Sequence, residues 1–170
     1  MSTKKAAAKK PASTNSSERD AIDLLKADHK EVKALFEQYK ALVENEEIEE
    51  ERQAVAQQIC LLLTVHATAE EEIFYPAARA AIADADLLDE AEVEHASAKD
   101  LIAQIEAMSP DDALYDAKVI VLGEYIDHHV KEEEGEMFPK CRKSDMDLVA
   151  LGEAIEARKA ELMDEMGALA

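Results

Sequence analysis

The chain has 170 residues and a mass of 18.7 kDa, the size of one domain with a sizeable core. Four Gly and four Pro are far below the usual combined share of about 12%, and Ala, Leu, Glu and Lys are abundant. This composition favours helices and argues against repeated β-hairpins. The formal net charge of −20 repels phosphate backbones and anionic lipid surfaces, so we expect no nucleic-acid or membrane partner.

Residues 1–16 are expected to form a disordered basic tail. They carry four lysines, no acid and no apolar segment, so they lack the pattern of a secretory signal. Their composition also resembles an organelle transit peptide, although the absence of Arg favours the disordered tail. No stretch approaches the roughly 20 apolar residues of a membrane span, and we expect a cytoplasmic protein.

Four long helices are predicted from apolar residues that recur with helical spacing. The first follows the candidate N-cap Ser17 and runs to about residue 43. The second follows the acidic stretch 44–51 and reaches residue 82, with a kink at Pro76. The third covers about 87–108, and Ser109 caps the fourth, which runs to near residue 139. Their apolar stripes are Ile22, Leu25, Val32, Leu35, Phe36, Tyr39 and Leu42; Val55, Ile59, Leu62, Leu63, Ile73 and Phe74; Val93, Leu101, Ile102 and Ile105; and Leu114, Val119, Leu122, Tyr125 and Ile126.

A fifth helix is predicted from the cap Ser144–Asp145 to about Met166, where Gly167 ends it. The connections between the first four helices are short, which favours antiparallel neighbours. We therefore predict an all-α fold: an antiparallel up-down-up-down four-helix bundle over residues 17–143, with an appended C-terminal helix over 144–170.

Histidines occupy the apolar stripe of every helix in the predicted bundle. Glu70 and Glu133 each follow a histidine by one helical turn and share its face. One inward imidazole is usually a satisfied core residue, but a buried carboxylate needs a compensating charge. The joint pattern therefore favours a metal centre in the bundle core. The four histidines are His29, His66, His95 and His129.

An internal repeat fixes the register of the fourth helix. Residues 66–76 align without a gap on residues 129–139, and both segments place a proline ten residues after the first histidine. In this alignment His66 matches His129, and Glu70 matches Glu133. His129 is therefore the inward residue, and His128 is expected on the surface or behind the ligands.

Four imidazoles and two carboxylates suit iron, or less well manganese, better than a closed structural zinc site. The two cysteines do not share this spacing, and Cys60 lies in an apolar run that favours a buried thiol. Six protein ligands exceed the need of one tetrahedral ion. We therefore expect two ions bridged by Glu70 and Glu133, with open positions for a small oxidant or gas.

These motifs resemble the hemerythrin family, specifically its HHE cation-binding branch, over about residues 20–143. The matching segments are Asp28-His29, the two His-x3-Glu repeats and Glu94-His95. The resemblance implies a non-haem di-iron bundle that handles dioxygen, peroxide, nitric oxide or iron. Oxygen carriers of the family have a second imidazole where Lys99 stands here, and His-x4-Asp on the fourth helix, so reversible oxygen carriage is not expected. The implied ligands are His29, His66, Glu70, His95, His129 and Glu133.

The leading hypothesis is a di-iron protein that binds or reacts with peroxide, dioxygen or nitric oxide, with catalase-like peroxide decomposition as its expected activity. Tyr125, one turn before His129, is either a proton donor or a core residue. We expect the stem of Lys99 to carry its ammonium to a bundle edge or a carboxylate. An iron-binding or iron-sensing module without turnover is the second hypothesis. A metal-free helical interaction domain is the third.

Overall fold

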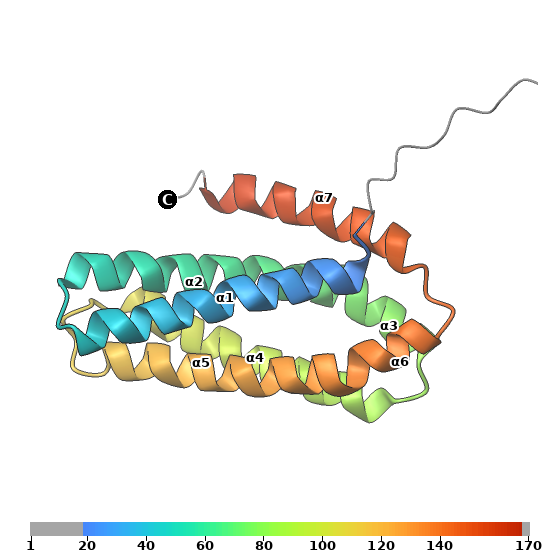
Figure 1. Ribbon diagram of the computed structural model, residues 1–170, viewed down its shortest axis with the longest axis horizontal. Helices are drawn as coiled ribbons and strands as arrows, with labels where there is room; N and C mark the ends of the chain where they lie inside the picture. The colour runs from blue at the N-terminus through green and yellow to red at the C-terminus, as the bar shows by residue number, and fades with distance from the viewer. Residues whose placement is uncertain (1–18, 168–170) are drawn as a thin grey trace, which may run out of the picture.

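The computed structural model describes residues 19–167, so the predicted tail and the candidate cap Ser17 lie outside it. Within this range every regular element is helical, which confirms the predicted all-α class (Figure 1). Two π-helical turns, η1 and η2, interrupt long helices. In chain order the elements are α1 (Ala21–Glu44), α2 (Glu49–Ala69), η1 (Glu70–Phe74), α3 (Tyr75–Ala81), α4 (Ala85–Ala107), α5 (Tyr115–Glu132), η2 (Glu133–Met137), α6 (Phe138–Lys143) and α7 (Leu148–Gly167).

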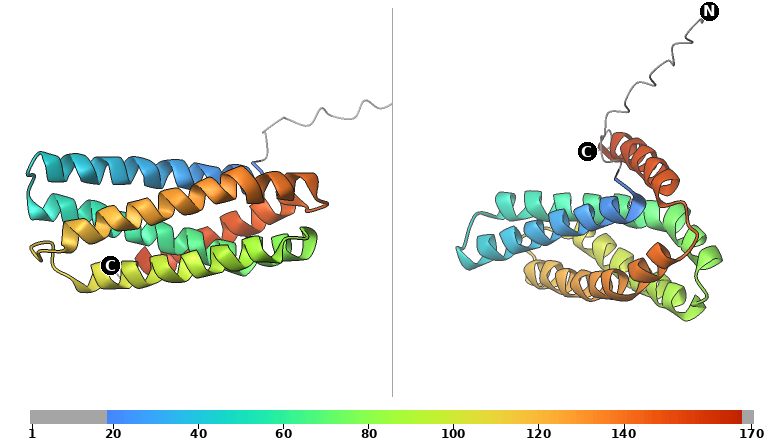
Figure 2. Two further views of the ribbon diagram at one scale, coloured as in Figure 1. Left: turned by 90° about the horizontal axis from the view of Figure 1, so that it is seen from below. Right: turned by 45° about the vertical axis from the view of Figure 1, so that its right-hand side comes forward.

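The bundle has four members: α1, α2 continued by α3, α4, and α5 continued by α6. Consecutive members run in opposite directions, and α1 contacts α2 and α5 while α4 contacts α5 and α2. The fifth helix, α7, stands outside this ring and lies along α1, α2 and η1 (Figure 2). No helix of the described residues is long and apolar enough to cross a membrane.

The first helix starts at a reciprocal cap. Asp20 Oδ1 accepts a hydrogen bond from the amide of Asp23 at 3.0 Å, and the Asp23 carboxylate accepts from the amide of Asp20 at 3.4 Å. Each acid satisfies an amide that the helix leaves free. The N-cap is therefore Asp20, and the predicted cap three residues earlier is wrong. Arg142 of α6 binds both Asp20 and Asp23, at 2.8 and 3.2 Å, and ties the two chain segments together.

Two other predicted helix starts are too early. Ser109 does not cap α5, because its amide donates to Asp112 Oδ2 at 2.8 Å in a turn that precedes the helix start at Tyr115. Ser144 does not cap α7 either, and an amide in the first turn of α7 donates to Asp147 at 3.1 Å instead. In both places aspartates downstream of the predicted cap capture free amides and delay the helix.

The interruption expected at Pro76 takes the form of a π-helical turn. The amide of Tyr75 donates to the carbonyl of Glu70, five residues back, and the amide of Phe138 donates in the same way to Glu133. The wider turn accommodates the missing N–H of the proline that follows each tyrosine or phenylalanine. The two halves of the sequence repeat thus share one local structure, and a glutamate begins each π turn.

Apolar side chains form one buried cluster at each end of the bundle. Ile22 and Phe74 belong to the cluster near α7, and Phe36 and Ile59 belong to the cluster at the opposite end. These clusters confirm most of the predicted stripes. Three stripe predictions are wrong, because the residues are 50–67% exposed on the outer faces of the bundle: Val93, Leu114 and Tyr125.

Gly152 is where α7 comes closest to α1. A Cβ at this position would lie 2.9 Å from the backbone nitrogen of Ala21 and 3.0 Å from the carbonyl oxygen of Arg19. Because backbone cannot yield as a side chain does, Gly152→Ala is expected to cost about 1–3 kcal/mol in urea unfolding. Gly135→Ala is the control, since a Cβ there meets nothing within 4 Å. Equal stability of both variants would contradict this packing.

Candidate metal centre

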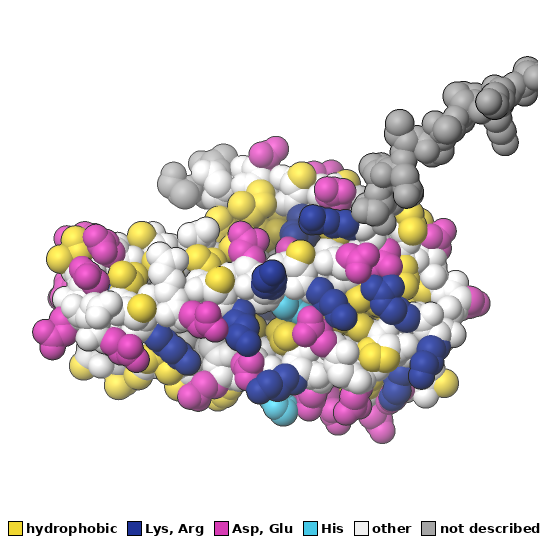
Figure 3. All heavy atoms as spheres, in the orientation of Figure 1, with side chains coloured by type: hydrophobic (Ala, Val, Ile, Leu, Met, Phe, Trp, Pro, Cys, Tyr) yellow, Lys and Arg dark blue, Asp and Glu magenta, His cyan; other side chains and the backbone are white. Residues whose placement is uncertain are grey.

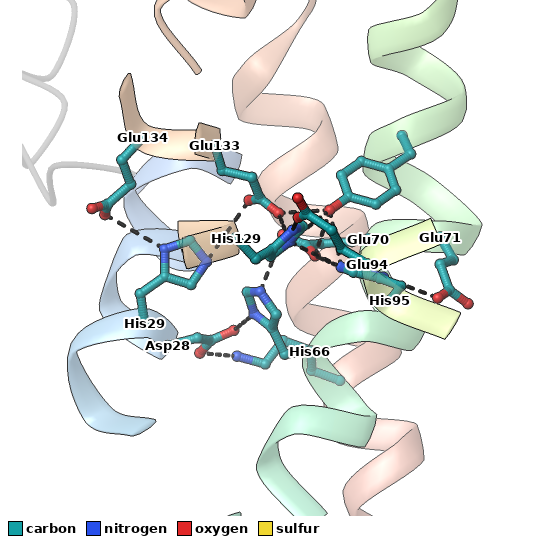
Figure 4. Close-up of polar contacts among 12 residues, drawn as sticks. Asp28, His29, His66, Glu70, Glu71, Glu94, His95, His129, Glu133 and Glu134 are labelled. Carbon is teal, nitrogen blue, oxygen red and sulfur yellow. Dashed lines mark hydrogen bonds and ion pairs between the residues drawn. The ribbon is translucent and has the colours of Figure 1, made fainter. Parts of the chain in front are cut away.

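The predicted ligands meet at mid-bundle, between the two apolar clusters (Figure 4). The histidines of α1, α2, α4 and α5 are each 5–9% exposed, and the glutamates that open η1 and η2 are 0–1% exposed. Their potential ligand atoms form two groups, in each of which all atoms lie within 4.8 Å of one another. One group is Glu70, His95, His129 and Glu133; the other is His29, His66 and Glu70.

Glu70 belongs to both groups. Its Oε1 is 3.1 Å from Nε2 of His66, and its Oε2 is 3.1 Å from Nε2 of His95. One carboxylate oxygen therefore faces each half of the site. This is the placement expected of a carboxylate that bridges two cations.

Glu133 is arranged in a similar way. Its Oε1 contacts Nε2 of His129, and its Oε2 lies 3.8 Å from Nε2 of His29. The two glutamates thus join all four histidines. The structure brings together the six residues that the sequence singled out.

Every one of the four imidazoles also faces a carboxylate with its outer nitrogen, Nδ1. A carboxylate behind an imidazole fixes the tautomer, so that Nε2 is free to act as a ligand toward the centre. It also makes that nitrogen a stronger donor to a metal. The pairs are Asp28 with His66 and Glu71 with His95, both at 2.9 Å; Glu134 with His29 at 3.5 Å; and Glu94 with His129.

Four inward atoms lack a hydrogen-bond partner among the described residues: Nε2 of His29, Nε2 of His66, Oε1 of Glu70 and Oε2 of Glu133. Buried polar atoms left unpaired are costly, and native proteins avoid them. Nε2 of His66 and Oε1 of Glu70 lie 3.1 Å apart but do not form a hydrogen bond. Imidazole nitrogens and carboxylate oxygens that converge in this way suit a cation. The residues present therefore fit a metal.

The site is also strongly polarised. Burial and the nearby His66 lower the pKa of His29 to about 4, so its imidazole is neutral. Burial opposes charge on His66 as well, but Glu70 and Asp28 raise its pKa to about 10. Burial also opposes charge on His129, but Glu133 raises the pKa of His129 to about 9. Metal binding must displace the protons from these two imidazoles, so affinity should fall as pH falls.

Tyr75, which the sequence analysis did not single out, lies inside the cluster. Its hydroxyl is 2.6 Å from Glu133 Oε1 and 3.1 Å from Glu70 Oε2, and it lies 3.0 and 3.2 Å from Nε2 of His95 and His129. Burial and the two carboxylates raise the pKa of Tyr75 well above its usual value, so the hydroxyl keeps its proton. The sequence repeat carries the signal for this residue. Tyr75 aligns with Phe138, so the first half of the repeat has a hydroxyl that the second half lacks.

The remaining predicted residues lie around the site. Tyr125 is 50% exposed, so the expectation that it packs as core is wrong. His128 is 67% exposed, 3.2 Å from Glu132, which confirms its predicted surface position. The ammonium of Lys99 contacts the carboxylate of Glu71, which is one of its two predicted positions.

The fold and the site together define a metal-binding helical bundle. The family model of the hemerythrin HHE cation binding domain matches residues 20–141, and the chain belongs to this family. A protein called a DNA nickase, from Nostoc sp., is 32% identical over 122 residues, which are 72% of this chain. The chain spans only 33% of the length of that relative.

A solved structure has the same fold. It is that of a hemerythrin HHE cation binding domain-containing protein from Mycobacterium kansasii, with a TM-score of 0.71 and 24% sequence identity. The similarity covers 86% of this chain and 89% of the other. The match therefore extends beyond the four-helix bundle.

Proposed function

We propose that this protein holds two non-haem iron ions in the His/Glu cluster and uses them to react with a small oxidant, above all hydrogen peroxide. The observation that carries the proposal is the shared position of Glu70 between two groups of buried imidazoles. One cation would be held by His95, His129 and both glutamates. The other would be held by His29, His66 and the same glutamates.

The donor set favours iron over a thiolate-preferring metal. All candidate ligands are imidazole nitrogens or carboxylate oxygens, which suit iron or manganese. Cys60 and Cys141 lie in the apolar clusters, and burial raises the pKa of their thiols to about 12 and about 11. Neither thiol therefore supplies a thiolate to the centre.

A small cavity is lined by all four histidines. Its volume is about 30 Å³, and apolar side chains such as Val32, Leu63 and Ile102 form much of its wall. A space of this size admits a molecule as small as water, dioxygen or peroxide. The proposal therefore names a small oxidant and not a metabolite.

When bound, two ferrous ions supply the two electrons that a peroxide O–O bond takes up on cleavage. Tyr75 holds a proton on its hydroxyl oxygen at the centre of the cluster, where it is placed to protonate a departing oxygen. The second peroxide releases two protons when it is oxidised to dioxygen, and one of them restores the Tyr75 hydroxyl. Over a full cycle one peroxide is oxidised to dioxygen and another is reduced to two waters, so no further reductant is needed.

The proposal does not extend to nucleic-acid chemistry. The chain corresponds to a third of the Nostoc protein, and its net charge is −20. On the face shown in Figure 3, lysines and arginines alternate with acidic side chains and form no continuous basic patch. Phosphate backbones are recognised by clustered positive charge. We therefore propose a small-molecule partner in place of a nucleic acid.

Protein expressed in iron-replete medium and purified in air is expected to contain close to two iron ions per chain. It should decompose hydrogen peroxide, releasing one dioxygen for every two peroxides, and chelation of the iron should abolish this activity. Elemental analysis and an oxygen electrode measure both quantities. A reproducible single iron would contradict the two-ion site, and native zinc would contradict the redox role. Two irons without peroxide consumption would support the iron-binding module instead.

A further inference from the structure

The fifth helix is attached to the side of the metal centre and lies beyond the family match, which ends at residue 141. It packs along α1, α2 and the π turn η1. Ile155 is fully buried in the same apolar cluster as Ile22 and Phe74, and Gly152 lies against the backbone at the start of α1. α7 is therefore held firmly next to the elements that carry His29, His66 and Glu70.

Two neighbouring cations of α7 reach acidic residues around the metal centre. Arg158 binds Glu72 of η1 with two nitrogens, at 2.7 and 3.3 Å. Lys159 contacts Asp28 Oδ1, and the other oxygen of Asp28 is 2.9 Å from Nδ1 of His66. The side chain of Asp28 is only 15% exposed, so Lys159 and His66 are its principal charged partners.

We propose that Lys159 is a positioning residue for the metal ligand His66, through which α7 strengthens metal binding in one half of the site. This proposal rests on the metal-binding function proposed above. Lys159 holds one oxygen of Asp28 and leaves the other directed at His66. A carboxylate held in this way keeps the imidazole in the tautomer and orientation that direct Nε2 at the centre. The ammonium also offsets the cost of burying the Asp28 charge.

The opposite half of the site has the same arrangement within the bundle itself. Lys99 contacts Glu71 Oε2, and Glu71 Oε1 is 2.9 Å from Nδ1 of His95. Each half therefore has one chain of lysine, carboxylate and imidazole. In one half the lysine comes from α4, and in the other it comes from the appended helix.

Because binding linkage is reciprocal, a helix that strengthens metal binding must itself be held more tightly when metal is bound. The ion pair from α7 is the path of this coupling, since Lys159 is fixed to Asp28 and Asp28 to the ligand His66. Metal should therefore slow the local opening of α7. Hydrogen exchange of the α7 amides reports such opening directly.

The test uses the full chain and Zn²⁺ as a diamagnetic probe. Lys159→Met keeps the apolar stem and removes the charge, and it is expected to weaken one of two bound Zn²⁺ ions about 10-fold, as loss of a group behind a ligand does. In imidazole ¹H–¹⁵N spectra, the Nδ1–H signal of His66 should shift while that of His95 stays. Lys99→Met should do the reverse.

Three controls separate positioning from loss of structure. Lys159→Arg keeps the charge and should restore the affinity and the His66 signal. Lys131→Met removes a surface ammonium that, within residues 19–167, is paired with Asp127 alone, and it should change neither. Zn²⁺ should slow hydrogen exchange in α7 of the wild type, and much less in Lys159→Met of equal helicity by circular dichroism.

The two proposals fail in different ways. If wild-type protein binds no metal ion of any kind, both are overturned. If it binds two ions but Lys159→Met binds both as tightly, with an unchanged His66 signal, only the role of Lys159 is overturned. An equal shift of His66 and His95 would also overturn it, because the effect would then be a general loosening of the bundle.

Discussion

His129→Ala is expected to abolish most metal binding and to lower the free energy of unfolding by about 3 kcal/mol, because it strands a buried carboxylate. The His129 imidazole contacts Glu133 with one nitrogen and Glu94 with the other, and Glu133 is 1% exposed. For a domain of this size the loss corresponds to a fall in melting temperature of about 10 °C. Elemental analysis and a thermal melt of the iron-loaded protein measure both effects.

The neighbouring residue provides a matched control. His128 has the same chemistry one position earlier, but its side chain is 67% exposed and contacts Glu132 on the surface. Substitution at such a site usually changes stability by no more than about 0.5 kcal/mol. His128→Ala should therefore keep its metal and its melting temperature. If the two variants exchange phenotypes, the inward face of α5 is one residue away from its place in the structure.

Helical periodicity was enough to predict the bundle and to gather the six candidate ligands. His95, for example, shares its face with Ala91, Ala98 and Ile102, all of which are buried. The same periodicity explains the error at Val93. This residue lies two positions before His95, about 200° away around the helix, and therefore points to solvent. That the six residues ligate a metal stays a prediction.

The helix starts could not be predicted as well, because several polar residues compete for the same free amides. Ser109 lies in a reasonable cap position, but the carboxylate of Asp112 accepts a hydrogen bond from the Ser109 amide. This bond closes a turn in place of a helix start. In α1 the acids Asp20 and Asp23 each accept a hydrogen bond from the other's amide, so the helix is capped at Asp20 and not at the predicted cap. Such choices depend on local hydrogen bonding, which an apolar pattern does not encode.

The tyrosine was missed because the π turn changes the helical register. In a regular α-helix a residue five positions after Glu70 lies well off its face. In η1 the amide of Tyr75 donates a hydrogen bond to the carbonyl of Glu70. The two side chains therefore lie on the same side of the helix, and the phenol enters the centre. The proline that follows is the visible signal of the interruption, but not of its π-helical form.

Tyr75→Phe is expected to leave iron binding intact and to slow peroxide decomposition about 100-fold, the usual contribution of a placed proton donor. The repeat itself suggests that the ring is tolerated, since Phe138 holds the equivalent position and stacks 5.9 Å from His29. What the change removes is the hydroxyl 2.6 Å from Glu133. The readouts are iron content, the initial rate of dioxygen release and its dependence on pH.

Tyr125→Phe provides the comparison, because it deletes the same hydroxyl from a half-exposed residue on α5 close to His129. Its rate and iron content should match those of the wild type. If Tyr75→Phe retains its rate within a factor of two, the proton comes from solvent and not from the phenol. If Tyr125→Phe is the slower variant, the proton enters through the α4–α5 groove, which His129 and Tyr125 line together. The buried hydroxyl would then serve only to separate Glu70 from Glu133 before metal binds.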